Sequence, residues 1–497
     1  MSVDTNNAEF QDALNLIQYT RQSVFLTGKA GTGKSTFLRY VCEHTKKKHV
    51  VLAPTGIAAI NAGGSTMHSF FKLPFYPLLP DDPNLSLQRG RIHEFFKYTK
   101  PHRKLLEQIE LVIIDEISMV RADIIDAIDR ILRVYSHNLR EPFGGKQLLL
   151  VGDVFQLEPV VKNDERDILN RFYPTPYFFS ARVFGQIDLV SIELQKVYRQ
   201  TDPVFVSVLD HIRTNTAGAA DLQLLNTRYG SQIEESEADM YITLATRRDT
   251  VDSINEKKLA ELPGDSITFE GVIEGDFPES SLPTSQELVL KPGAQIIFIK
   301  NDFDRRWVNG TIGVIAGIDE EEETIYVITD DGKECDVKLE SWRNIRYHYN
   351  EKTKEIEEEV LGSFTQYPIR LAWAITVHKS QGLTFSRVVI DFTGGVFAGG
   401  QAYVALSRCT SLDGIQLKKP VNRADVFVRP EIVNFAGRFN NRQAIDKALK
   451  QAQADVQYAA ASRAFDKGDM EECLEQFFRA IHSRYDIEKP VPRRLIR

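Results

Sequence analysis

One glycine-rich segment constrains the fold of this chain more than any other feature. Residues 28–36 read GKAGTGKST and satisfy the pattern GxxxxGK[ST]. Glycines in such a loop let successive backbone N–H groups turn inward around phosphate oxygens, while Lys34 reaches the outer phosphates and the Ser35 hydroxyl ligates Mg²⁺. The segment follows the apolar run SVFLTG and precedes the helix-like stretch FLRYVCEHT. This strand–loop–helix context predicts an α/β fold with an ATP site in the loop.

We expect Lys34 to be catalytic as well as binding, because it can stabilise charge on the transferred phosphoryl group. The residues expected to contact the nucleotide through this loop are Gly28, Ala30, Gly31, Thr32, Gly33, Lys34, Ser35 and Thr36.

Apolar runs alternate with helical patterns through the first 160 residues. The runs SVFLTG, HVVLAP, LVIIDE and QLLLVGD are rich in Val, Ile and Leu, and each ends in a polar or glycine-containing turn. Such runs are typical of buried parallel strands. Ligands bind just outside the carboxyl ends of the strands in sheets of this kind. The polar residues at these ends are therefore candidate site residues.

Two of the runs end in groups that suit phosphoryl transfer. LVIIDE places Asp115 where it can hold Mg²⁺ through water together with Ser35, and Glu116 where it can polarise the attacking water. LVGDVFQLEPV places Gln156 beside the same site, where its amide can orient water or sense the γ-phosphate. The expected cofactors are thus ATP and Mg²⁺.

The remaining sequence divides into further segments. A proline-rich aromatic insertion interrupts the first α/β pattern, a second α/β pattern follows, and a β-rich stretch with NG and DG hairpin signals interrupts the second. An alanine-rich helical segment ends the chain, with residues 444–465 and 470–483 read as a helix pair joined at DKGD. The predicted domains are a first motor domain at residues 1–62 and 101–180, its small insertion at 63–100, a second motor domain at 181–286 and 364–420, a small β-barrel insertion at 287–363, and a helical C-terminus at 421–497.

The composition excludes several classes of protein. A formal net charge of −8 argues against a chain coated in positive charge, although a local basic groove remains compatible with nucleic acid. The four cysteines show no zinc-binding spacing and no disulfide framework, which favours a reducing compartment. No run approaches the roughly 18 apolar residues of a membrane span, and the N-terminus has no leader pattern. We expect a cytoplasmic protein without membrane contact or structural zinc.

Six segments occur together in the order of superfamily 1 helicases: GKAGTGKST, LAPTGIAAINAGG, VIIDEISM, GDVFQLEPV, ITVHKSQGLTF and VALSRCTS. Within superfamily 1B, ELQKVYRQTDPVFVSVLDHIR and EISMVRADIIDAIDRILR…PFGGKQLLLVGD resemble the petite-integration-frequency (PIF) family of DNA helicases. The similarity extends over residues 11–417. Because almost nothing precedes the matching region, the chain resembles a compact bacterial member of the family. The resemblance implies two RecA-like P-loop motor domains with parallel sheets. Lys29 departs from the family, which usually has a small residue there.

The resemblance assigns further roles at the nucleotide. It implies that Arg199 and Arg408 reach the γ-phosphate as arginine fingers from the second motor domain, so that hydrolysis depends on domain closure. It also implies that Gln11 recognises adenine and that the backbone of Gly382 approaches the γ-phosphate.

A track for nucleic acid follows from equivalent positions in the two motor domains. Thr55 in APTG and Thr376 in ITVHKS follow strands, where short hydroxyls and backbone N–H groups can hold phosphates without reading sequence. Histidines and phenylalanines nearby can stack on bases, and lysines can pair with phosphates, although a core role is an equal alternative for Phe70 and Phe71. The expected nucleic-acid contacts are Thr55, Gly56, His68, Phe71, Lys72, Thr376, His378 and Lys379.

The resemblance implies an ATP-dependent helicase that moves 5′ to 3′ on single-stranded DNA, acts as a monomer, and unwinds forked or structured DNA. G-quadruplexes and RNA–DNA hybrids are implied substrates, with residues 63–100 as a wedge and the β-rich insertion as a clamp. Two alternatives remain open at the level of sequence. One is a RecD-like helicase, and the other is a nucleic-acid-stimulated ATPase that clamps or translocates without separating strands.

Overall fold

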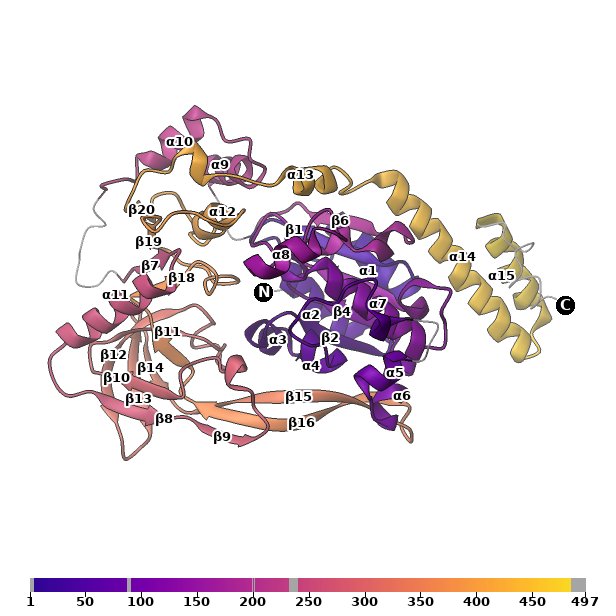
Figure 1. Cartoon of the computed structure of the whole chain (residues 1–497), viewed down its shortest axis with the longest axis horizontal. Helices are drawn as coiled ribbons and strands as arrows, with labels where there is room; N and C mark the ends of the chain where they lie inside the picture. Colours follow the sequence, from indigo (N-terminus) through magenta and orange to yellow (C-terminus); the bar gives the residue numbers. More distant parts are fainter. Residues whose placement is uncertain (1–3, 87–90, 199, 201, 232–239, 484–497) are drawn as a thin grey trace.

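The computed structural model describes residues 4–86, 91–198, 200, 202–231 and 240–483. Figure 1 shows two α/β domains side by side, a β-rich domain beneath the second of them, and two helices projecting from the far side of the first. Both α/β domains have all-parallel sheets, as the sequence predicts. Among the described residues, no helix is both long and apolar enough to cross a membrane.

The first sheet has six parallel strands in the order β3-β2-β4-β5-β1-β6. The four apolar runs of the sequence form its central strands, which are buried because helices cover both faces. These central strands are β1 (Val24–Gly28), β2 (His49–Ala53), β4 (Leu111–Ile114) and β5 (Gln147–Val151). The outer strands are β3 (Ser65–Thr66) and β6 (Val190–Leu194).

Side chains alternate between the two faces of this sheet and enter two separate cores. Val24 and Leu26 pack with one core, which includes Phe10 and Phe37, whereas Phe25 enters the other. The first core lies under α1 (Ala8–Tyr19) and α2 (Lys34–His44), and the second under α6 (Lys100–Gln108) and α7 (Ala122–Tyr135). The shorter helices are α3 (Gly56–Ala62), α4 (Met67–Phe71), α5 (Arg91–Phe96) and α8 (Asn163–Leu169).

Two predicted domain boundaries are wrong because they separate strands of this sheet from their neighbours. β6 pairs in parallel with β1, so the first domain continues to Leu194 instead of ending at residue 180. β3 pairs with β2, so residues 65–66 belong to the sheet and not to the 63–100 insertion. Much of that insertion packs onto the first domain, since Leu73, Leu78 and other apolar side chains of it join the core that contains Phe25.

The second sheet has four parallel strands in the order β18-β7-β19-β20. Ile242, Leu244, Val388 and Ile390 point to one face of this sheet and join one core, whereas Ala245 and Ala374 on the other face pack with Val251. Its strands are β7 (Ile242–Ala245), β18 (Ala374–Thr376), β19 (Val388–Asp391) and β20 (Ile415–Leu417). Its helices are α9 (Pro203–Arg213), α10 (Ala219–Asn226), α11 (Arg248–Glu261) and α12 (Gln401–Leu406).

The β-rich domain is larger than the predicted 287–363, because it begins at β8 and ends at β17. Its main sheet is an antiparallel ladder in the order β14-β13-β12-β11-β17, and β15, β16 and β9 form a second sheet. The strands are β8 (Ile267–Glu270), β9 (Val272–Gly275), β10 (Glu287–Leu290), β11 (Gln295–Phe298), β12 (Ile312–Asp319), β13 (Thr324–Thr329), β14 (Glu334–Val337), β15 (Glu340–Asn350), β16 (Glu355–Gln366) and β17 (Ile369–Leu371).

The hairpin of β15 and β16 reaches from the β-rich domain back to the first motor domain (Figure 1). Tyr347 is buried there, and its ring lies 6.2 Å from that of Phe70 in an edge-on arrangement. Ile345 and Tyr349, two residues to either side on the same face of the strand, pack against the same core. The hairpin therefore spans the gap between the β-rich domain and the first motor domain.

The predicted helix pair at the C-terminus is confirmed as α14 (Arg442–Asp466) and α15 (Met470–Ser483), preceded by α13 (Pro430–Ala436). The start of α14 packs against α1, where Ile445 and Ala448 enter the core of Phe10. Arg442 also forms an ion pair with Asp12 of α1 at 2.5 Å. The helix pair is thus anchored at one end and extends away from the body of the molecule (Figure 1).

Candidate ATP-driven motor site

The phosphate loop connects the end of β1 to the start of α2, where Gly33 caps the helix with φ of 91°. Gly28 also has a left-handed φ of 154°, and a Cβ atom there would lie 2.5 Å from Thr32 Oγ1. Both positions therefore require glycine. The Lys34 ammonium donates to the carbonyl oxygens of Gly28 at 2.6 Å and Lys29 at 3.0 Å. The loop and the helix N-terminus together form a cationic cradle that suits a phosphate group.

The two acidic residues follow β4, at the same edge of the sheet as the loop. The backbone N–H of Glu116 donates to Asp115 Oδ1 at 2.9 Å, and Glu116 itself is left-handed, with φ of 49°. Non-glycine residues adopt this conformation at a cost and often at functional sites. Burial raises the pKa of both carboxyl groups, and the charges of Lys34 and Arg408 lower the pKa of Glu116. Glu116 is thus electrostatically coupled to cations from both motor domains, and Asp115 to Lys34 of the first.

A cavity of about 620 Å³ lies where the first motor domain, the second motor domain and the β-rich domain meet. The residues that line it include some that the sequence predicts to bind the metal ion, the nucleotide or DNA. The first domain supplies Ser35, Thr55, Asp115 and Glu116, and the second supplies His378, Lys379 and Gly382. None of the other predicted site residues that the structure describes lines this cavity.

Arg370 also lines the cavity, and the sequence did not single it out. Burial lowers its pKa to about 10, and no carboxylate pairs with it among the described residues. Lys379 lies nearby. Burial and the positive charge of Arg370 both lower the pKa of Lys379. An enclosed cation without a protein counter-ion suits a phosphate ligand.

Three contacts tie the phosphate loop and its neighbours to the second motor domain. The backbone N–H of Ala30 donates to the buried Tyr403 hydroxyl at 3.0 Å. Lys29, the residue that departs from the family pattern, forms an ion pair with Asp210 of α9. The side-chain amide of Gln381 donates to Gln156 Oε1 at 3.4 Å. Gln156 therefore lies at the interface of the two motor domains, where its predicted sensing role would operate.

Arg213 makes a further and more extensive contact between the two motor domains. Its guanidinium, only 3% exposed, pairs with Asp153 at 3.0 Å and with Glu193 at 2.8 Å. It also lies 4.4 Å from the centre of the Phe155 ring. Neither Arg213 nor Tyr403 stands in a pattern that marks its role, because their partners are far away in sequence.

Of the two predicted arginine fingers, the structure describes only Arg408. Arg408 is completely buried and donates to the carbonyl oxygens of Val404 at 2.9 Å and of Ser380 and Leu383 at 3.3 Å. Its charge nevertheless acts on Glu116 across the cleft. Arg199 lies outside the described residues.

The predicted adenine residue, Gln11, lies in the first turns of α1 and donates to the carbonyl of Thr5 at 2.7 Å. Tyr198 lies on the phosphate loop itself, since its N–H donates to the carbonyl of Gly31 at 2.9 Å. The ring of Tyr198 lies 3.9 Å from the position that a Cβ atom on Gly33 would occupy. This half-exposed ring is a further candidate for stacking on a nucleobase.

Thr55 and Thr376 hold equivalent places, as expected from their positions after strands. The Thr55 hydroxyl accepts the N–H of Ala58 at 3.3 Å, and the Thr376 hydroxyl accepts the N–H of Lys379 at 3.2 Å. Each hydroxyl keeps its own proton free to donate to a phosphate. Burial lowers the pKa of His378, so the ring is neutral at pH 7 and can donate or accept a hydrogen bond.

The expectation that Phe71 stacks on DNA bases is wrong for this structure. Phe71 has no exposed surface and packs in the core that contains Phe25. Lys72 is exposed, and the ring of His68 stacks on that of Phe75 at 5.0 Å. Phe75 is 82% exposed, so it offers the free aromatic surface that Phe71 lacks.

Two α/β domains share a cleft: the first carries the phosphate loop and the carboxylates, and the second supplies cations on the opposite wall. This arrangement defines an NTP-driven motor of the superfamily 1 helicase class. The sequence profile of the PIF1-like helicases matches residues 5–215. The ATP-dependent DNA helicase Pif1 of Campylobacter jejuni is 34% identical over 412 residues, which cover 80% of this chain and 88% of that protein.

Solved structures agree with the sequence matches. Pif1 from a Bacteroides species in complex with ADP-AlF4 is 41% identical, with a TM-score of 0.79 over 86% of this chain and 96% of that one. Bacteroides Pif1 bound to single-stranded DNA is 40% identical, with a TM-score of 0.63 over 89% of this chain and 99% of that one. The chain belongs to the Pif1 helicase family and is an ATP-dependent DNA helicase.

Replacing Arg213 with Lys tests whether this guanidinium aligns the two motor domains. A lysine keeps the charge but cannot bind both carboxylates through a planar fork. We expect DNA-stimulated kcat for ATP hydrolysis to fall about tenfold, with nucleotide affinity changed by less than about threefold. Arg228→Lys, which alters an arginine that contacts Asp413 away from the cleft, is the control. Equal losses in the two variants would contradict an aligning role.

Replacing Arg370 with Ala tests the unpaired cation of the cavity. We expect the affinity for oligodeoxythymidylate to fall, and the slope of log affinity against log salt to decrease by about one unit, as for the loss of one phosphate contact. Arg343→Ala is the matched control, because its neighbour Trp342 lines the cavity and successive strand side chains point to opposite faces. An unchanged salt dependence in Arg370→Ala would exclude the contact.

Proposed function

We propose that this helicase translocates 5′ to 3′ on single-stranded DNA and separates strands at forked duplexes. The observation that carries the proposal is the shared cavity, in which Ser35, Asp115 and Glu116 lie with His378 and Lys379. Movement of the domains around a nucleotide would therefore also move the residues proposed to hold DNA. The direction of movement rests on the resemblance to the Pif1 family.

ATP would bind with its phosphates in the cradle of residues 28–36 and its adenine between Gln11 and Tyr198. Tyr198 bonds the loop at Gly31, and its hydroxyl donates to Asp4, just ahead of the helix α1 that carries Gln11. Lys34, which already bonds two loop carbonyls, would transfer those bonds to the outer phosphates. The resulting site would hold the nucleotide mainly through backbone N–H groups and one cation.

Ser35 and Asp115 fit a magnesium ion, because both line the cavity and offer the oxygen ligands that this ion prefers. When bound, the ion neutralises charge on the outer phosphates. Glu116 would orient the attacking water; burial raises the pKa of this carboxyl group to about 7, and the charge of Lys34 acts against that rise and favours the ionised form. Gln156 would report the presence of the γ-phosphate to the second domain through Gln381.

Coupling to movement would come from the second motor domain. Arg408, Arg199 and the backbone of Gly382 would approach the γ-phosphate on closure, while Arg213 keeps the domains in register through Asp153. Thr55 and Thr376, with Gly56 beside the first, would grip successive phosphates of the strand in alternation. His68, Lys72 and Phe75 would extend this track over the first domain.

The remaining proposals concern further substrates, the oligomeric state, the roles of the two insertions and the cellular compartment. The resemblance supports G-quadruplexes and RNA–DNA hybrids as further substrates, and a monomer as the active form. It also supports the 63–100 insertion as a wedge and the β-rich domain as a clamp. The four cysteines are unpaired, which supports a reducing, cytoplasmic environment.

Substitution of Arg408 tests the proposed catalytic cleft. Arg408→Ala is expected to retain nucleotide binding and to lose about a thousandfold in ATP turnover, because an arginine finger acts on the transition state. Lys34→Ala is expected to abolish turnover entirely. Arg408→Lys serves as the conservative comparison, since it keeps a charge in the buried position. Normal turnover in Lys34→Ala, or weaker nucleotide binding without slower turnover in Arg408→Ala, would contradict the assignment.

Unwinding of three substrates tests the direction of movement. Duplexes with a 5′ single-stranded tail, a 3′ tail and no tail are mixed with the enzyme and ATP, and strand release is measured by fluorescence. We expect release only from the substrate with the 5′ tail. Release from the 3′-tailed duplex alone would show that the enzyme moves in the opposite direction. ATP hydrolysis without release from any substrate would show that the protein is a translocase or clamp that does not separate strands.

A further inference from the structure

A second cavity lies on the first motor domain at the edge of the sheet formed by β6, beside the C-terminal helices. This rear pocket, of about 640 Å³, is lined by Phe179, Phe184, Leu189, Ser191, Phe435 and Arg438, with further residues of α14 at its rim. Six of its fifteen lining residues come from α13, α14 and the turn between them. Those elements follow residue 417, where the helicase motifs end, so the rear pocket is separate from the motor site.

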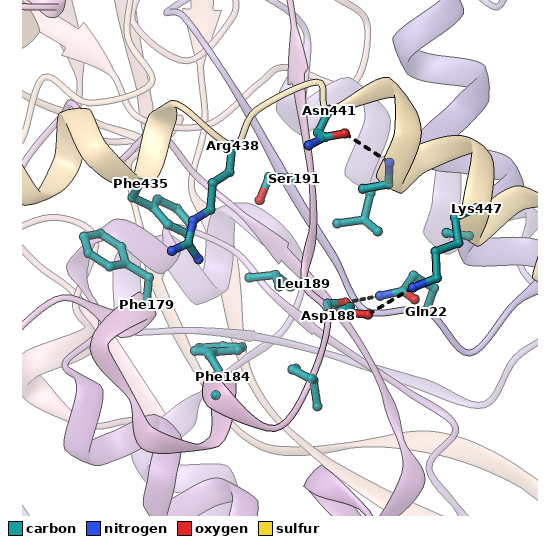
Figure 2. Close-up of a pocket in the computed structure, with 15 residues that line it drawn as sticks. Gln22, Phe179, Phe184, Asp188, Leu189, Ser191, Phe435, Arg438, Asn441 and Lys447 are labelled. Atoms are coloured by element: carbon teal, nitrogen blue, oxygen red, sulfur yellow. Dashed lines mark hydrogen bonds and ion pairs between the residues drawn. The ribbon is translucent and has the colours of Figure 1, made fainter.

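The rear pocket combines an apolar, aromatic part with polar groups of Gln22, Ser191 and Asn441 on its wall. Phe179 and Phe435 stack with ring centres 4.3 Å apart, and Phe184 and Leu189 complete the wall and floor (Figure 2). The volume accommodates a large side chain. A leucine or phenylalanine that entered it would leave water for an apolar surface, a gain of about 1.5–3 kcal/mol.

The polar group at the mouth is Arg438. Figure 2 shows its side chain beside Phe435, directed over the pocket. Among the described residues its guanidinium has no ion pair or hydrogen bond, and the residue is exposed. An unpaired guanidinium above an apolar pocket is well placed to bind a carboxylate through two parallel hydrogen bonds.

The surroundings of Arg438 are basic as well. Arg442, Lys447 and Lys450 follow it on α14, and the described stretch from 438 to 450 contains a single acidic residue, Asp446. Asp188, the one acidic residue that lines the pocket, faces Lys447 at 3.9 Å on an exposed surface (Figure 2). Such a long exposed ion pair is weak, so Lys447 remains able to bind another anion.

A peptide fits this chemistry better than a nucleic acid. A nucleobase carries several hydrogen-bonding groups on its edge, and any of them that met the phenyl and leucyl side chains of the pocket would be left unpaired at a cost in free energy. An apolar side chain has no such groups. The anion that meets Arg438 would then be a carboxylate next to that side chain on the same chain.

We propose that the rear pocket binds an acidic segment of a partner protein, inserting one large apolar or aromatic side chain between Phe184 and Phe435 while Arg438 binds an adjacent carboxylate. The pocket thus serves as a docking site that recruits or positions the helicase, and it is independent of the direction and substrates proposed above.

A fluorescent peptide tests this docking site on the full chain. The probe is a run of aspartates ending in a leucine and a phenylalanine with a free terminal carboxylate, and its binding is followed by anisotropy. We expect saturable binding in the micromolar range. Arg438→Ala is expected to weaken binding at least about tenfold, and Ala444→Trp, which fills the pocket without changing charge, should do the same.

Lys450→Ala is the matched control, because Lys450 lies on the same helix, carries the same charge and does not line the pocket. It should bind the probe as the unmodified chain does, and all three variants should retain DNA-stimulated ATP hydrolysis. Three results would each overturn the proposal: no saturable binding of the probe, equal binding by Arg438→Ala, or displacement of the probe by oligodeoxythymidylate with the same dependence on Arg438.

Discussion

The buried guanidinium of Arg213 is the contact on which the arrangement of the motor depends. It comes from the end of α9 and meets two carboxylates of the other motor domain, Asp153 after β5 and Glu193 in β6. Removing one partner of such a buried ion pair typically costs about 3–5 kcal/mol, because a charge is left without compensation. Separation of the two domains would therefore expose all three groups together. Ion pairs thus hold the two domains in register, together with Leu157 of the first domain, which packs in the apolar core of the second.

The same contact explains why the phosphate loop is attached to both domains. Tyr403, whose hydroxyl accepts the N–H of Ala30, lies near Asp153 and Arg213, and their charges act on its pKa in opposite directions. Lys29 adds a charge pair to Asp210 on the same helix that ends in Arg213. The loop that cradles phosphate is thus bonded to the domain that has to move. A nucleotide that rearranges the loop necessarily changes these interdomain bonds.

Local sequence was sufficient wherever one segment carried the whole signal. The strand–loop–helix of residues 28–36 and the apolar runs could be assigned, because buried parallel strands have a distinctive composition and their carboxyl ends meet at one edge. Arg213 and Tyr403 could not be found in this way, since Asp153 lies 60 residues from Arg213 and Ala30 lies 373 residues from Tyr403. β6 was assigned to the wrong domain for the same reason, as only its pairing with β1 shows where it belongs.

Phe71 was misjudged because an aromatic residue after a motif has the same sequence signature in a core and at a surface. The alternation of Ile345, Tyr347 and Tyr349 did carry a signal of period two, which marks one apolar face of the hairpin.

β6 also connects the motor cleft to the rear pocket, through a second set of contacts on its outer edge. The segment before α14 pairs with this edge, because the N–H of Asn440 donates to the carbonyl of Ser191 at 3.0 Å. The side chain of Asn440 bonds both the N–H and the carbonyl of Glu193, at 2.8 and 2.9 Å. Glu193 uses its carboxylate for Arg213, whereas Ser191 lines the rear pocket. A displacement of the turn before α14 would have to break the bonds of Asn440 or to shift the backbone that carries Glu193. The C-terminal segment is therefore joined through one strand to the ion pair that aligns the two motor domains.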